Sequence, residues 1–233
     1  MNKMSWLYIK VLFRNKRAVF QPINIVIFFY IGLFQFVVGA ENNLLIQEVL
    51  GYSLAIISTG LFFTLHSYRL VSINFDALSV WPISYSSINL SVWLISFYIS
   101  TLIFLSGFLV LVFLNKSLIF DLLSCYLFTI GVSNVAYLAL AIQEEKRYDP
   151  SLSAFSTKGS RVSHPFINNA VTLCLGLFVF LVKMLSNWFG GYLFWFLMSS
   201  AGVVGLLLNP ILLKKVDEFV LQRSYLMKEG FRK

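Results

Sequence analysis

The residues with the most reactive side chains are two histidines, His66 and His164, and an adjacent pair of acids, Glu144-Glu145. Histidine and carboxylate side chains that converge can bind zinc, which activates a bound water for hydrolysis. Two histidines, both near the ends of apolar runs, leave such a site short of ligands. No Gly-x-x-x-x-Gly-Lys-Ser/Thr phosphate loop is present either. The chain is therefore predicted to carry no catalytic residue, no metal, no cofactor and no nucleotide hydrolysis of its own.

A membrane-embedded hydrolase remains an alternative. Phe62-x-x-x-His66, Glu144-Glu145 and His164-x-x-x-Asn168 are similar to pieces of an intramembrane protease site of the prenyl-protein type. The pattern departs from that site because Asp149 stands where an arginine is expected and because the three pieces occur in a different order. Hydrolysis that is lost on changing either histidine would support this alternative.

A second set of chemically distinctive residues lies in the segment 66–89, which separates two apolar runs. Arg69 and Asp76 are its only charged residues, and aromatic and aliphatic side chains surround Asp76. An amphipathic segment held between membrane spans is suited to lie at the membrane surface and to contact a partner. Together with two arginines before the first span, its members are the predicted partner-docking residues: Phe75, Asp76, Leu78, Trp81, Pro82, Arg14 and Arg17.

The composition places these residues in an all-α integral membrane protein. Hydrophobic residues make up 58% of the 233 residues, charged residues only 12%, and the mean hydropathy is +0.80. The net charge of +8 is carried in short basic blocks beside apolar runs. This pattern is typical of topology signals and of contact with membrane lipids, and it argues against nucleic acid binding. Cys125 and Cys174 lie within apolar runs and are predicted to be packing residues.

About 20 apolar residues are needed to cross a hydrocarbon layer of about 30 Å. Six runs meet this requirement. The first is predicted to be a transmembrane helix that is not cleaved, and not a signal peptide. The predicted spans are Pro22 to Gly39, Leu45 to Leu65, Ile88 to Leu114, Leu122 to Ile142, Phe166 to Leu185 and Gly190 to Leu213.

Basic residues set the expected orientation. Sixteen of the 18 lysines and arginines fall before span one, after spans two and four, or after span six, and only Lys116 and Lys183 fall on the other side. Because positively charged loops stay in the cytoplasm, both termini and the loops 66–89 and 143–165 are predicted to be cytoplasmic.

The organisation then has three parts. Residues 1–21 are predicted to form an amphipathic elbow helix, residues 22–213 the transmembrane domain, and residues 214–233 a basic tail that continues span six as a helix and stops at Gly230. Inside the spans, Gln35, Ser133 and Asn134 are expected to form interhelical hydrogen bonds. Asp121 and Lys183 are expected to extend their charged groups to the membrane interface.

The passage from Asn74 to Ser84 (NFDALSVWPIS) resembles the acid, hydrophobic, Pro-Ile/Val-Ser pattern of ABC-2-type export permeases. Three more pieces are similar to the C-terminal half of a family of uncharacterised ABC-2-like bacterial membrane proteins. They are Arg14-Asn15-Lys16-Arg17, Lys146-Arg147-Tyr148-Asp149 with Ser153-Ala154-Phe155 and Gly159, and Lys228-Glu229-Gly230-Phe231-Arg232. The sequence departs from the pattern at Ser156-Thr157-Lys158, where Asn-Tyr-Gln is expected, and at Val92-Trp93, where a basic residue usually opens span three.

The resemblance implies a function. In that superfamily a coupling helix in the loop before span three and an N-terminal elbow helix engage a separate ATPase. This chain would then be the membrane subunit of an exporter in the bacterial inner membrane, partnered by an ABC ATPase subunit and forming a homodimer or heterodimer of permease subunits. A non-transporting membrane scaffold or assembly factor is the first alternative, and the hydrolase is the second.

Overall fold

The computed structural model describes residues 16–65, 67, 85–142 and 165–232, and every regular element within these ranges is a helix. Six helical segments are long and apolar enough to cross a membrane, as predicted. They are Pro22–Asn42, Leu45–Thr64, Ser86–Leu114, Lys116–Ala141, Phe166–Phe189 and Tyr192–Gln222. The chain is therefore a multi-pass membrane protein.

The spans are built from the following helical elements. They are α2 (Lys16–Asn42), α3 (Leu45–Thr59) with the π-helical turn η1 (Gly60–Thr64), α6 (Tyr85–Leu114), the 3-10 turn η2 (Lys116–Leu118), α7 (Ile119–Phe128), the π-helical turn η3 (Thr129–Ser133), α8 (Asn134–Ala141), α9 (Pro165–Phe189) and α10 (Tyr192–Arg232).

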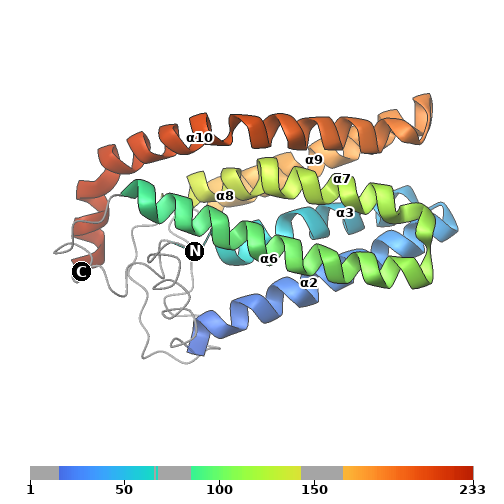
Figure 1. The fold of residues 1–233 in the computed structure, drawn as a ribbon, viewed down its shortest axis with the longest axis horizontal. Helices are drawn as coiled ribbons and strands as arrows, with labels where there is room; N and C mark the ends of the chain where they lie inside the picture. The colour runs from blue at the N-terminus through green and yellow to red at the C-terminus, as the bar shows by residue number, and fades with distance from the viewer. Residues whose placement is uncertain (1–15, 66, 68–84, 143–164, 233) are drawn as a thin grey trace.

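The helices run side by side along the long axis of the molecule, and three short connections gather at one end of the bundle (Figure 1). We call this the hairpin end; its turns lie at Asn43, Asn115 and Gly190. Asn43 and Gly190 adopt positive φ values of 54° and 122°, as residues that terminate a helix commonly do. The beginning of α2 and the end of α10 lie at the opposite end.

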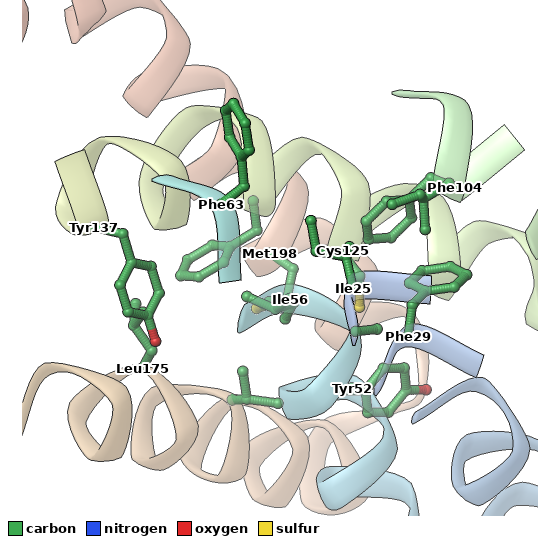
Figure 2. Packing of buried hydrophobic residues seen from close by; sticks show 14 of the residues in the cluster. Ile25, Phe29, Tyr52, Ile56, Phe63, Phe104, Cys125, Tyr137, Leu175 and Met198 are labelled. Atoms are coloured by element: carbon green, nitrogen blue, oxygen red, sulfur yellow. The ribbon is translucent and has the colours of Figure 1, made fainter. Parts of the chain in front are cut away.

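Side chains from α2, α3, α6, α7, α9 and α10 converge on one core (Figure 2). Aromatic rings occupy much of it, and several pack edge to face or tilted, as Phe29 does on Phe104 and Tyr52 on Phe194. The labelled core residues include Ile25, Phe29, Tyr52, Ile56, Phe104, Cys125, Leu175 and Met198. Cys125 is buried in this core and forms no disulfide, in keeping with its predicted packing role.

Glycines allow two pairs of helices to approach closely. A Cβ on Gly51 of α3 would lie 2.4 Å from the backbone nitrogen of Phe36 on α2. A Cβ on Gly131 of η3 would lie 2.1 Å from the carbonyl oxygen of Gly202, and one on Gly202 of α10 would lie 2.4 Å from the carbonyl carbon of Leu127. Backbone contact of this kind is a principal source of helix association in lipid, where no hydrophobic force drives helices together.

Three of the differences from the predicted elements change how the spans are built. Span four is a chain of α7, η3 and α8, with a π-helical turn that the apolar pattern does not reveal. The loop 66–89 is shorter than expected because Tyr85 already begins α6. α2 begins at Lys16 and runs past Pro22 without interruption, so no helix end separates residues 16–21 from the first span.

The prediction that the basic tail continues span six as a helix is confirmed. α10 continues from the last span through the basic residues as a single helix. It ends at Arg232 and so passes Gly230, because a glycine within a helix lowers its stability without forcing a stop.

Alanine substitution tests the glycine contacts. We expect Gly131→Ala and Gly202→Ala each to lower the stability of the purified protein by about 1–3 kcal/mol, because the added methyl group must displace backbone atoms. The measurement is the temperature at which half of the protein survives heating in mild detergent, followed by size-exclusion chromatography.

Gly176→Ala is the matched control. Gly176 is also within a transmembrane helix, but its Cβ would meet nothing closer than Ser53 Oγ at 3.9 Å. Equal losses at Gly176 and Gly131 would mean that alanine acts through the helix itself, and the interpretation of close contact would then be wrong.

Candidate functional site

Three buried side chains at the centre of the bundle form a closed ring of hydrogen bonds. Thr59 comes from the end of α3, Ser100 from α6 and Asn134 from the start of α8. The Thr59 hydroxyl donates to Asn134 Oδ1 at 3.3 Å, Asn134 Nδ2 donates to Ser100 Oγ at 3.2 Å, and the Ser100 hydroxyl donates to Thr59 Oγ1 at 3.1 Å. Each residue both donates and accepts, so these buried polar groups satisfy one another.

Two further bonds extend the ring along the same helices. Thr64 Oγ1 and Ser96 Oγ lie 2.8 Å apart and join η1 to α6. The Ser133 hydroxyl donates to the carbonyl oxygen of Ile56 at 3.1 Å and joins η3 to α3. We call the six side chains the central polar cluster; all are fully buried, and they are Thr59, Thr64, Ser96, Ser100, Ser133 and Asn134.

The cluster is located where both π-helical turns occur. Thr59 directly precedes η1, and Asn134 directly follows η3. A π-helical turn changes the local hydrogen-bond spacing and often marks a functional position in a helix. Tyr137 of α8 packs its ring against Gly60 of η1, where a Cβ would lie 2.1 Å from the ring, and its hydroxyl lies 2.8 Å from Thr172 Oγ1 on α9. Spans two, three, four and five are therefore joined near one level.

A second group of polar side chains lies near the hairpin end. Lys183 Nζ on α9 lies 3.1 Å from Glu48 Oε1 on α3, and both side chains are largely buried, with 11% and 13% of their surface exposed. Tyr52 donates its hydroxyl hydrogen to Asp121 Oδ2 at 2.8 Å. The Lys183 amine also lies 5.4 Å from the ring centroids of Tyr52 and Phe194. This charged cluster connects α3, α7, α9 and α10.

Asp121 and Lys183 were expected to extend their charged groups to the membrane interface, and this expectation is wrong. Each has a partner on another helix, so pairing inside the bundle takes the place of hydration at the interface. The signal in the sequence is Glu48, an acid near the start of span two, which gives the lysine of span five an opposite charge within reach.

The prediction of interhelical hydrogen bonds is confirmed for Ser133 and Asn134. The structure gives Gln35 no such bond to any described residue. The other four members of the central polar cluster, Thr59, Thr64, Ser96 and Ser100, were not predicted. The spacing of Ser96 and Ser100 was a usable signal, because residues four apart share one face of a helix.

Six of the seven predicted docking residues lie outside the part of the chain that the structure describes. Phe75, Asp76, Leu78, Trp81 and Pro82 lie in the range 68–84 and Arg14 in the range 1–15, outside the described residues. Arg17 belongs to α2, but only its backbone is described.

Most residues of the hydrolase alternative also lie outside the described ranges. His66, Glu144-Glu145 and His164 lie outside the described residues, and Asn168 is a buried residue of α9. Within the described ranges no three histidine, cysteine, aspartate or glutamate side chains group together as metal ligands would. The central polar cluster contains no ionisable group, so it is suited to holding helices in register and not to acid–base chemistry.

Comparison of the chain with family models, with characterised proteins and with solved structures gives no match.

The charged cluster predicts an asymmetric mutational response. Lys183→Met is expected to destabilise the protein by about 3 kcal/mol, because it leaves Glu48 as a buried charge without its cation. Replacing both residues in Glu48→Met/Lys183→Met should restore most of the lost stability, since neither charge of the pair then remains. The measurement is thermal survival in detergent.

Lys116→Met is the control at the same end of the molecule, since Lys116 is an exposed lysine. A loss at Lys116 equal to that at Lys183, or a double variant as unstable as Lys183→Met alone, would contradict this account.

Proposed function

We propose that this chain is the membrane subunit of an ABC-2-like exporter, whose mechanical work comes from a separate ATPase that binds the segment 68–84. The observation that carries the proposal is the hydrogen bonding between the two helices that flank this segment. η1 ends at Thr64 on one side and α6 begins at Tyr85 on the other. A force applied to the segment therefore acts on both helices together.

The contacts offer a route for this force into the bundle. Thr64 and Ser96 connect the flanking helices at the level nearest the segment. Deeper in the bundle, Ser100 and Thr59 connect the same helices and pass the link to Asn134 at the start of α8. Displacement of spans two and three would thus carry span four with it, or would exchange these bonds for others.

The π-helical turns supply places where such a change can occur. In η1, the Gly60 N–H donates to the carbonyl oxygen of Ile57, while the Ile56 carbonyl oxygen accepts the Ser133 hydroxyl from span four. Hydroxyl side chains can move between neighbouring acceptors at low cost, because their donors rotate freely. The proposed motion tilts spans two and three against span four and opens a path between two permease subunits.

A further contact joins the start of α6 to the basic tail. Asn89 Nδ2 donates to Asp217 Oδ1 on α10. The pair brings the start of α6 next to the helix that bears Lys214 and Lys215. Sixteen of the 18 lysines and arginines fall on one side of the predicted spans. We therefore assign this end of the bundle, the loops 66–89 and 143–165 and both termini to the cytoplasm of a bacterial cell. An ATPase in the cytoplasm would meet the segment there.

Co-purification tests the docking part of the proposal. The wild-type chain, extracted in mild detergent from its native membrane, is expected to retain an ABC ATPase chain. Asp76→Ala/Trp81→Ala should remove that chain without altering the elution volume or the thermal survival of the membrane subunit. Ser79→Ala, in the same segment, is the control and should retain it.

An intact wild-type complex without any ATPase would favour the scaffold alternative, and unchanged recovery of the ATPase from the double variant would overturn the assignment of the docking residues. Assigning the bound chains and their stoichiometry by mass spectrometry distinguishes these results.

The coupling route predicts a different phenotype for the central polar cluster. Ser96→Ala/Ser100→Ala removes the hydroxyls that link α6 to η1 and α3, at a cost in stability of about 0.6–1.7 kcal/mol for each bond. We expect the variant to keep its bound ATPase. The increase in the rate of ATP hydrolysis that assembly produces should be several-fold smaller than in the wild type.

Ser200→Ala is the control, because the Ser200 hydroxyl donates only within its own helix, to the carbonyl oxygen of Leu197. Loss of ATPase binding in the α6 variant, or stimulation equal to that of the wild type, would show that the cluster does not transmit the force.

A further inference from the structure

An apolar groove of about 800 Å³ lies between η3, α8, α9 and α10. Its size falls within the range of roughly 300–1,000 Å³ that is usual for small-molecule sites. α10 lies against η3, α8 and α9 along this stretch (Figure 1). The residues that define the groove are Val135, Ala139, Ala201, Val204, Leu208 and Lys215.

The groove is open at the outer surface of the bundle. Val204 and Leu208 line it and still expose 53% and 43% of their surface. Small residues such as Ala139 and Ala201 leave space between helices that larger side chains would fill. A hydrocarbon chain can therefore enter from the side and make van der Waals contacts that the walls of an empty groove would lack.

The groove is long enough to hold a lipid tail. The lining residues of α10 run from Ala201 to Phe219, and Ala201 and Lys215 are fourteen positions apart on this helix, which corresponds to about 21 Å at 1.5 Å per residue. This is about two thirds of a hydrocarbon layer of roughly 30 Å. The groove thus extends along the direction in which acyl chains lie, and beyond the middle of the bilayer.

Lys215 places a positive charge in the part of the groove that lies toward the end of α10, where Val216 and Phe219 also line it. It is the only charged residue among the groove-lining residues. The apolar run of α10 ends at Leu213, directly before Lys214 and Lys215. A lysine at this position places its amine at the depth of the lipid headgroups, where phosphate is found. No carboxylate of a described residue forms an ion pair with it.

We propose that the groove binds an anionic glycerophospholipid of the surrounding bilayer, with one acyl chain between α8 and α10 and the headgroup phosphate against Lys215. The apolar walls select a hydrocarbon chain, and the single cation selects the negative headgroup. This site is separate from the central polar cluster and does not depend on the exporter assignment.

The test uses native mass spectrometry of the full-length purified protein titrated with phosphatidylglycerol or with phosphatidylcholine of identical acyl chains. We expect one phosphatidylglycerol to be retained at concentrations at least five-fold lower than phosphatidylcholine. Lys215→Gln should abolish this preference. Lys214→Gln, which removes the same charge from the neighbouring position outside the groove, should preserve it.

A second pair of variants tests the acyl-chain part. Val204→Phe fills the groove and should weaken retention of both lipids at least five-fold. Val203→Phe adds the same ring to the adjacent exposed residue, which does not line the groove, and should have no effect. A phosphatidylglycerol with a photoreactive acyl chain should label peptides of α8 and α10 in the wild type and not in Val204→Phe.

Three results would overturn the proposal. Equal effects of Lys214→Gln and Lys215→Gln would assign the preference to the basic tail as a whole. Competition by millimolar inorganic phosphate would indicate an anion site without a lipid tail. Association of Val204→Phe into a different oligomer from the wild type, with lipid retention unchanged, would mean that a helix of another chain occupies the groove.

Discussion

Six apolar helices in a bilayer gain no free energy by hiding apolar surface from one another, because lipid tails cover that surface equally well. Their association must come from close packing and from polar groups that have no partner in lipid. This chain uses both at defined positions. Gly51 and Gly202 bring backbones into contact, and the ring formed by Thr59, Ser100 and Asn134 satisfies buried polar groups that would otherwise be costly.

The two kinds of contact meet at η3. Gly131 within this turn touches Gly202 of α10, and Ser133 and Asn134 at its end bond to spans two and three. Span four therefore lies between two groups of helices and is held to each by a different force. Its π-helical turn sets the orientation of Ser133 and Asn134 relative to Gly131. Movement of span four relative to α10 is restricted by backbone contact, whereas movement relative to α3 and α6 needs only an exchange of hydroxyl partners.

The charged cluster at the hairpin end acts differently from the central one. Glu48 and Lys183 are ionic groups on different helices, and the Lys183 amine lies over the rings of Tyr52 and Phe194. Tyr52 is itself bonded to Asp121. Separating these charges inside lipid would be expensive, so the hairpin end is the less deformable part of the bundle. A bundle held firmly at one end and by exchangeable hydroxyl bonds in its middle can tilt its helices at the other end, where the proposed docking segment joins η1 to α6.

The sequence by itself determined the helical class, the number of spans and most of their limits, because the requirement for about 20 apolar residues acts locally along the chain. It also identified Ser133 and Asn134 as polar groups that must find partners within the membrane. Only the tertiary structure decided which partners these are, since Thr59 and Ser100 are distant in sequence from Asn134 and come together through the packing of three helices. The inward position of Lys183 likewise depends on the approach of Glu48 from another span. The groove that contains Lys215 forms where α10 packs against span four and α9, a property of paired surfaces that no single stretch of sequence contains. The apolar pattern does not reveal the two π-helical turns either.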